Sequence, residues 1–268
     1  MTAASIDPFH AIAIGELAYQ LAAQGRSVIH MEYGQPSTGA PSKSIAVAHE
    51  VLDRDPMGYW ESPRLKERIA QTYAEAHGMT IDPDQVFLTC GASPALVLAL
   101  GCLFAPGERV ALARPGYVAY RNTLRALYLE PVEIECGAAQ RYQLTAEALA
   151  ALDPAPAGVI LASPANPTGT VLAESEMAAI AAVCRARGIR IISDEIYQAI
   201  SYVGPVASVL PHAPDALIVN SFSKYFSMAG WRLGWLVVPP ELIETARARV
   251  GNLFLTPPSL AQHAGLAA

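Results

Sequence analysis

The sequence contains very little lysine. Of its 18 basic side chains, only Lys43, Lys66 and Lys224 are lysines. Arginine serves wherever a positive charge suffices, whereas only lysine readily loses its proton and attacks a carbonyl carbon. Lys224 lies between two serines in the segment Asn220–Trp235, NSFSKYFSMAGWRLGW, and is therefore a candidate nucleophile. Taken alone, however, most lysines in loops are simply solvated cations.

Several other features are missing from the sequence, and each absence excludes a class of function. The net charge is −6 with no run of Lys or Arg, so nucleic acids and anionic membranes are poor candidate partners. The longest apolar run, Ala95–Ala105, is too short to span a bilayer, and no positive cluster precedes Asp7 as in a secretory signal. The histidines lack metal-ligand spacing, so we expect no metal site. The four cysteines form no CxxC pair, which predicts reduced, mostly buried thiols in a cytoplasmic protein.

From about residue 85 onward, short apolar runs alternate with helical patterns. The predicted strands are Gln85–Thr89, Arg109–Ala113, Gly158–Ala162, Ile189–Ser193, Ala216–Asn220 and Gly234–Val238. The predicted helices between them are Pro94–Phe104, Tyr117–Leu127, Ala173–Arg187 and Glu241–Val250. This alternation indicates an α/β fold with a mostly parallel sheet that is buried on both faces.

The first eighty residues have a different pattern. They predict the helices Phe9–Gln24, Ser44–Leu52 and Pro63–His77 and one short strand, Val28–Glu32. We therefore expect residues 1–45 to form an N-terminal arm and the start of a small domain, and residues 46–268 to form the large domain.

Polar side chains follow four of the predicted strands. These are the segment CGAS after the first strand, SPANPTG after Gly158–Ala162, Asp194 to Tyr197 after Ile189–Ser193, and Ser221 to Lys224 after Ala216–Asn220. In open α/β sheets, ligands bind beyond the carboxyl ends of the strands. The sequence therefore predicts a ligand site at this edge of the sheet.

In this order, the motifs resemble those of the class I and II aminotransferases, enzymes of fold type I that depend on pyridoxal 5′-phosphate. The resemblance runs from about Ile6 to the last residue. It is carried by GQP (Gly34–Pro36), GAS (Gly91–Ser93), NPTG (Asn166–Gly169), SDEIY (Ser193–Tyr197) and SFSK…GWRLG (Ser221–Gly234). It implies a three-layer sandwich around a mostly parallel sheet, and the transfer of an amino group between a small-molecule amino acid and a 2-oxo acid.

The resemblance also implies the chemistry at the centre of the site. Lys224 would form a Schiff base with the cofactor aldehyde and then act as the proton shuttle. Asp194 would face the pyridine nitrogen and favour its protonated form, while Glu195 would point away and have no assigned role. Asn166 and Tyr197 would donate to the cofactor's phenolic oxygen.

The remaining implied contacts concern the phosphate, the ring and the substrate. Arg232 would bind the phosphate together with Ser221, Ser223 and the helix start formed by Gly91, Ala92 and Ser93. Tyr117 would stack on the cofactor ring, and Gly34 and Asn166 would contact the substrate. Tyr59, in MGYWES, resembles the tyrosine that reaches the phosphate of the partner subunit, which implies a homodimer.

Members of this family continue into a small C-terminal domain, which carries an arginine for the substrate carboxylate. This sequence ends at SLAQHAGLAA, within an expected interdomain helix, and no residue matches that arginine. We therefore expect the C-terminal small domain to be largely missing, transamination to be poor and some apolar surface to be exposed.

Four alternative functions remain open from the sequence. The same cofactor loops are compatible with a carbon–sulfur lyase or β-eliminase, with an inactive truncated form that only binds the cofactor, and with a sensor. GASPA also resembles a nucleophile elbow, which would make Ser93 the nucleophile of a serine hydrolase, with an Asp–His pair taken from Asp194 or Asp215 and His212 or His263. A dinucleotide site and a P-loop are not expected, because no GxGxxG follows a strand and no Gly-Lys pair occurs.

Overall fold

The computed structural model describes residues 6–202 and 204–268, so the first five residues of the predicted arm lie outside the described part. The helices are α1 (His10–Ala23), α2 (Ser42–Leu52), α3 (Pro63–His77), α4 (Ala92–Leu103), α5 (Val118–Ala126), α6 (Ala146–Ala150), α7 (Glu174–Arg187), α8 (Ile243–Leu253) and α9 (Ser259–Leu266). The strands are β1 (Val86–Thr89), β2 (Arg109–Arg114), β3 (Glu130–Glu135), β4 (Gly158–Ala162), β5 (Arg190–Asp194), β6 (Leu217–Ser221) and β7 (Gly234–Val237).

The strands form one sheet in the order β1-β7-β6-β5-β4-β2-β3. The strands from β6 to β3 pair in parallel, and β7 lies antiparallel to both β1 and β6. The predicted mostly parallel α/β sheet is therefore confirmed, with β7 as its reversed strand. The parallel arrangement brings the carboxyl ends of β4, β5 and β6 to one edge.

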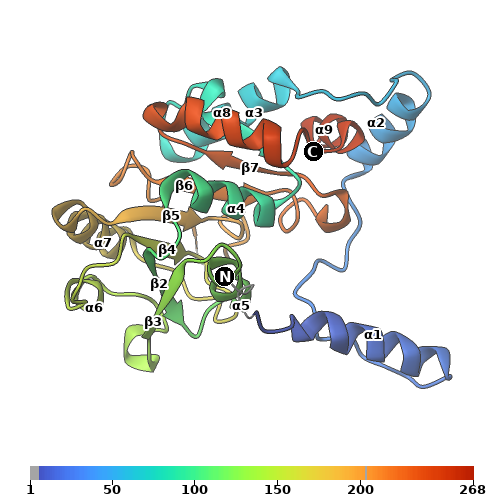
Figure 1. The fold of residues 1–268 in the computed structure, drawn as a ribbon. Coiled ribbons are helices and arrows are strands. Elements are labelled where there is room, and N and C mark those ends of the chain that lie inside the picture. The colour runs from blue at the N-terminus through green and yellow to red at the C-terminus, as the bar shows by residue number, and fades with distance from the viewer. Residues whose placement is uncertain (1–5, 203) are drawn as a thin grey trace.

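Helices cover both faces of the sheet and give three layers (Figure 1). Because successive side chains of a strand point to opposite faces, Ile191 of β5 packs in one apolar cluster and Ile192 in the other. The first cluster includes side chains of α3, α7 and α9, and the second includes side chains of α4, α5 and α8. Burial on both faces explains why the strands are almost continuously apolar.

Local signals define the ends of two helices that support the site. The Ser62 hydroxyl accepts a hydrogen bond from the Leu65 N–H, so α3 begins with a capped first turn and with proline at its first position. Gly78 ends α3, and Gly188 ends α7, each in the left-handed conformation that glycine adopts without strain.

The N-terminal arm reaches away from the sandwich, and α1 lies apart from the other helices in Figure 1. The predicted strand Val28–Glu32 is wrong, because this segment has no regular structure. Ile29 and Met31 are 85% and 87% exposed, and no strand of the described sheet pairs with this segment. Helix α2 begins at Ser42 and packs against α9, while the predicted domain boundary at residue 45 stays a prediction.

Strand β3 was not expected from the sequence. Three of its six residues, EPVEIE, are glutamates, and in the described sheet the strand pairs only with β2 at the lateral edge. An edge strand tolerates proline because one side of its backbone needs no partner in the sheet. The four cysteines are free; Cys136 and Cys184 are buried, and Cys90 and Cys102 are half-buried.

Candidate active site

Residues from three separate segments meet at the edge where the parallel strands end. Asp194 is the last residue of β5, Ser221 is the last residue of β6, and Asn166 follows β4. Lys224 comes three residues after Ser221, in the turn that leads back towards β7. The structure thus brings together the strand ends at which the sequence predicted a ligand site.

Asp194 is buried and lies next to a tyrosine that the sequence did not identify as part of the site. The Tyr120 hydroxyl donates to Asp194 Oδ2 at 2.7 Å, and the Ile196 N–H donates to Oδ1 at 3.1 Å. Burial raises the pKa of Asp194, while these two donors and the nearby Lys224 oppose the rise. A buried carboxylate that is held by two donors is suited to pair with a protonated ring nitrogen.

Lys224 is half-buried between the arm and the sheet edge. Its Nζ donates to the Gly34 carbonyl at 2.6 Å and lies 5.9 Å from the centre of the Tyr197 ring. Burial lowers the pKa of Lys224, and Arg232 lowers it further. Both effects favour the neutral amine, which is the nucleophilic form.

Asn166 and Tyr197 face each other across the same site. The Asn166 Nδ2 atom lies 3.5 Å from the Tyr197 hydroxyl, in a long hydrogen bond. The loop of Asn166 is held by the buried Gln143, whose Nε2 donates to Thr170 O at 2.8 Å and to Ala162 O at 3.3 Å. Gln143 was not predicted, because its contacts are 19 and 27 residues distant in sequence.

A cationic corner is formed where β1 leads into α4. Arg232 donates to the carbonyl oxygens of Ala229 and Cys90, each at 3.0 Å. Gly91 caps α4 with φ of 100°, and a Cβ there would stand 2.5 Å from Arg232 Nη2. The guanidinium can therefore lie against the helix start only because residue 91 has no side chain. Helix α4 begins at Ala92, so Pro94 is its third residue rather than its first as expected.

Two buried serines stand at the end of β6. The Ser221 hydroxyl accepts a hydrogen bond from the Ser223 N–H at 3.1 Å, which tightens the turn before Lys224. The backbone N–H of Ser221 is satisfied by Asn220 Oδ1 at 2.8 Å. The Ser221 hydroxyl is therefore held in the turn that leads to Lys224.

The two remaining predicted tyrosines differ in their surroundings. Tyr117 caps α5 and packs edge-on against Tyr120, with ring centres 5.3 Å apart, and against Phe9 of the arm at 6.2 Å. Tyr59 is 85% exposed in the loop before α3. Its predicted contact with a partner subunit stays a prediction.

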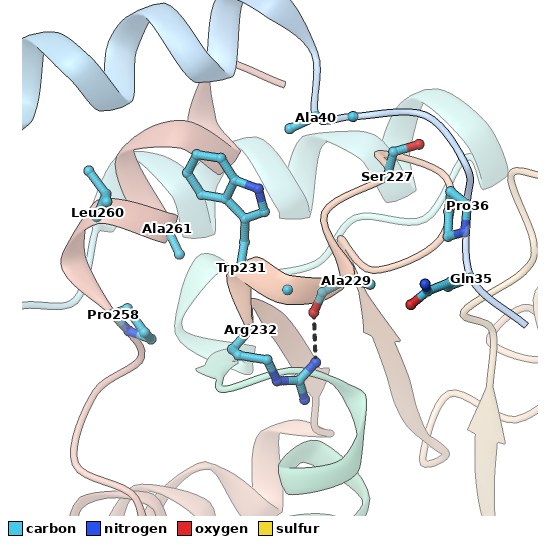
Figure 2. A pocket seen from close by; sticks show the side chains of 12 residues that line it. Gln35, Pro36, Ala40, Ser227, Ala229, Trp231, Arg232, Pro258, Leu260 and Ala261 are labelled. Carbon is cyan, nitrogen blue, oxygen red and sulfur yellow. Dashed lines mark hydrogen bonds between the residues drawn. The ribbon is translucent and has the colours of Figure 1, made fainter. Parts of the chain in front are cut away.

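A cavity of about 660 Å³ adjoins the cationic corner. In Figure 2 the indole of Trp231 lies between the α9 segment of Leu260 and Ala261 and the arm at Ala40, and Arg232 points to the other side of the same turn. Arg232 is the one charged side chain among the residues that line this cavity. The neighbouring arm is fastened by a 2.7 Å hydrogen bond between the Thr38 and Ser227 hydroxyls.

The donor set fits pyridoxal 5′-phosphate. Arg232 and the start of α4 offer an anion site, because the absence of a side chain at Gly91 lets the guanidinium lie against the helix start. The buried Asp194 offers a partner for a protonated pyridine nitrogen, and Lys224 offers an amine for the aldehyde.

The two histidines considered for a serine hydrolase lie elsewhere. His212 Nε2 is 3.6 Å from Glu174, and His263 Nε2 is 3.5 Å from Asp55 with its ring stacked on Trp60. Within residues 6–202 and 204–268, neither histidine is paired with Ser93. In the same described part, no cluster of His, Cys, Asp and Glu suits a metal ion, and no helix is long and apolar enough to cross a membrane.

Comparisons with known proteins agree with a site for pyridoxal 5′-phosphate. Residues 28–268 match the family described as aminotransferase class I and II. The chain is 43% identical over 270 residues to a valine–pyruvate aminotransferase of Mycobacterium tuberculosis, covering 99% of this chain and 70% of that protein. It is 32% identical to an aspartate aminotransferase of Geobacillus stearothermophilus, with the same coverage.

Solved structures show the same relationship. An aminotransferase from Mycobacterium tuberculosis superimposes with a TM-score of 0.95 at 42% identity, covering 99% of this chain and 70% of that one. The aspartate aminotransferase of Thermus thermophilus, solved with maleate, gives a TM-score of 0.93 at 27% identity and covers 100% of this chain and 73% of that one. The chain belongs to the class I and II aminotransferases, which are pyridoxal 5′-phosphate-dependent enzymes.

Proposed function

We propose that this chain transfers an amino group between an amino acid and a 2-oxo acid, and that Lys224 is the residue to which the cofactor is attached. The observation that carries the proposal is the place of the Lys224 amine, half-buried with a lowered pKa in one site with Asp194 and Arg232. An amine in its neutral form adds to an aldehyde, whereas a guanidinium does not.

The bound cofactor supplies an electrophilic carbonyl group and a ring that accepts electron density from the substrate. Arg232, the start of α4 and the serines Ser221 and Ser223 would hold its phosphate. Asp194 would keep a proton on the ring nitrogen, and Tyr120 would keep the Asp194 carboxylate oriented by its 2.7 Å hydrogen bond.

Lys224 would also move the proton. Once its Nζ is free, it can take a proton from the substrate's α-carbon and return it at a neighbouring atom, since its pKa is lowered towards the working range. The Gly34 carbonyl, 2.6 Å from Nζ, would orient the amine between these positions. Asn166 and Tyr197 would hold the cofactor's phenolic oxygen.

For the substrate, we propose an aliphatic amino acid as donor and pyruvate as acceptor. The support is the name of the relative that is 43% identical, a valine–pyruvate aminotransferase. The cavity lined by Trp231, Leu260 and Pro258 is largely apolar, with Arg232 as its one charged lining residue. A dicarboxylic donor would need a cation for its second carboxylate, and Arg232 is assigned to the phosphate in this proposal.

We also propose a homodimer in which Tyr59 reaches the partner's phosphate, and a cytoplasmic location. The exposure of the Tyr59 ring supports the first. The scattered free cysteines support the second. The division into an arm of residues 1–45 and a large domain of residues 46–268 is part of the same proposal.

The central test is covalent attachment. Purified protein is mixed with pyridoxal 5′-phosphate, reduced with borohydride and analysed by peptide mass spectrometry. We expect the reduced adduct on Lys224, no adduct on Lys224→Ala, and an unchanged adduct on the exposed control Lys43→Ala. A stable adduct elsewhere, or none on the wild type, would refute the proposed role of Lys224. Release of ammonia and pyruvate without amino transfer to an oxo acid would instead indicate β-elimination.

A further inference from the structure

Glu195 is a fully buried carboxyl group that the proposed chemistry does not use. It directly follows Asp194, and its N–H still pairs with Val219 O of β6 at 2.9 Å. Since strand side chains alternate, Asp194 points towards Tyr120 and Glu195 points to the opposite face, where Ser193 and Val209 lie. The two adjacent carboxyl groups thus lie on opposite faces of the sheet and have different hydrogen-bond partners.

A single oxygen of Glu195 receives all of its donors. Oε1 accepts from the Ser193 hydroxyl at 3.1 Å, the Ser208 hydroxyl at 2.9 Å and the Val209 N–H at 3.1 Å. In the described part of the chain, no donor reaches the buried Oε2. The carboxyl group therefore ties residues 208 and 209 to the end of β5 through one acceptor atom.

Glu195 also begins a turn that carries a site residue. The Gln198 N–H donates to Glu195 O at 3.0 Å, and the Ile200 N–H donates to Tyr197 O at 2.8 Å, so residues 195–200 fold back on Glu195. Asp194 precedes this turn and Tyr197 lies within it. Loosening Glu195 would therefore disturb both neighbours at once.

We propose that Glu195 is a positioning residue, which holds Asp194 and Tyr197 in place by anchoring the end of β5 to the segment of Ser208 and Val209. It acts through the acceptor oxygen Oε1, so a neutral side chain with an oxygen in the same place should hold Asp194 and Tyr197 equally well. This inference rests on the proposed cofactor site.

Because Oε2 is buried without a donor among the described residues, the anchoring role predicts a pH dependence of folding stability that packing alone would not produce. Burial raises the pKa of Glu195 to about 7, and the charge of the adjacent Asp194 adds to the rise. Among the described residues, Tyr73 of α3 is a further titratable group whose pKa responds to the charge of Glu195. A carboxyl whose pKa is higher in the folded than in the unfolded state stabilises the fold at low pH, and this stability is lost as the pH rises towards 7.

The experiment compares Glu195→Gln, Glu195→Ala and Ser208→Ala with the wild type. One readout is the thermal midpoint between pH 5 and pH 8 without added cofactor, and the other is the dissociation constant of pyridoxal 5′-phosphate. We expect Glu195→Gln to bind within about threefold of the wild type and to lose less thermal stability as the pH rises, because glutamine keeps the acceptor oxygen and does not titrate.

We expect Glu195→Ala to bind the cofactor at least about tenfold more weakly, with Ser208→Ala shifted in the same direction by less. If Glu195→Ala does not fold, Ser208→Ala and Glu195→Gln still test the idea. Wild-type affinity in both alanine variants, or a thermal pH profile of Glu195→Gln that matches the wild type, would overturn it. Failure of the wild type to bind the cofactor would refute the proposed site instead, and the thermal profiles would still report on Glu195.

Discussion

Replacing Tyr120 with phenylalanine isolates one hydrogen bond in the candidate site. The ring of Tyr120 packs in the apolar cluster with α4, and its hydroxyl reaches Asp194 Oδ2 at 2.7 Å. Tyr120→Phe keeps the ring and removes only the donor. The buried carboxylate would then retain the Ile196 N–H as its remaining donor among the described residues.

The size of the effect follows from the type of hydrogen bond. A hydrogen bond to a charged group contributes about 1.5–3 kcal/mol, and removing it leaves that much less stabilisation of the ionised form. The pKa of Asp194, which burial already raises, should therefore rise further. The ionised carboxylate is the form that would pair with a protonated ring nitrogen, so the cofactor should bind about tenfold or more weakly.

Two measurements check this reasoning. The dissociation constant of pyridoxal 5′-phosphate is measured for the wild type, for Tyr120→Phe and for Tyr128→Phe, a control whose ring is 53% exposed. Thermal unfolding without cofactor is followed at pH 5 and pH 8. Because the raised pKa destabilises the fold as the pH rises, Tyr120→Phe should lose more stability at pH 8 than at pH 5. Unchanged affinity together with a parallel pH dependence would show that the hydroxyl does not support the charge of Asp194.

Two further predictions concern the phosphate corner. Gly91→Ala places a Cβ 2.5 Å from Arg232 Nη2 at a φ of 100°, so we expect backbone strain of about 1–3 kcal/mol. Because the guanidinium would be displaced, the cofactor affinity, measured by titration, should fall by about tenfold. An unaffected affinity would mean that the guanidinium does not bind the phosphate. Arg232→Lys loses the planar fork, so pyridoxal 5′-phosphate should bind about tenfold more weakly while pyridoxal, which has no phosphate, binds as before. An equal loss for both ligands would place Arg232 outside the phosphate site.

The sequence predicted the sheet well because its strands are strongly apolar and bounded by clear breaks. The predicted strand Ile189–Ser193 differs from β5 by one residue, and the helix Pro63–His77 has the bounds of α3. The sequence-based prediction of strands failed where the local residue pattern does not match the position of the segment in the fold. Val28–Glu32 has the composition of a strand but no neighbouring strand, and β3 carries glutamates at three of its six positions because it lies at the edge.

The site was predictable to the extent that its residues follow strand ends. Asp194, Ser221 and Asn166 lie at the ends of adjacent strands, so topology alone brings them together. Tyr120 and Gln143 could not be found in this way. Tyr120 is separated from Asp194 by 74 residues and reads as an ordinary apolar position of a helix. Supporting residues of this kind become visible only when their partners are placed in space.

At the end of β5, the need to bury a carboxylate and the need to keep it ionised oppose each other. A carboxylate that pairs with a cationic ring must be buried to exclude water, yet burial alone would neutralise it by raising its pKa. At Asp194 the hydroxyl of Tyr120 and the N–H of Ile196 offset this cost. At Glu195 no donor reaches the second oxygen within the described residues, and the pKa rises to about 7. Both carboxyls are buried, but Asp194 has a donor on each oxygen whereas Glu195 has donors on Oε1 alone, and this difference suits Asp194 to pairing with a cation and Glu195 to anchoring.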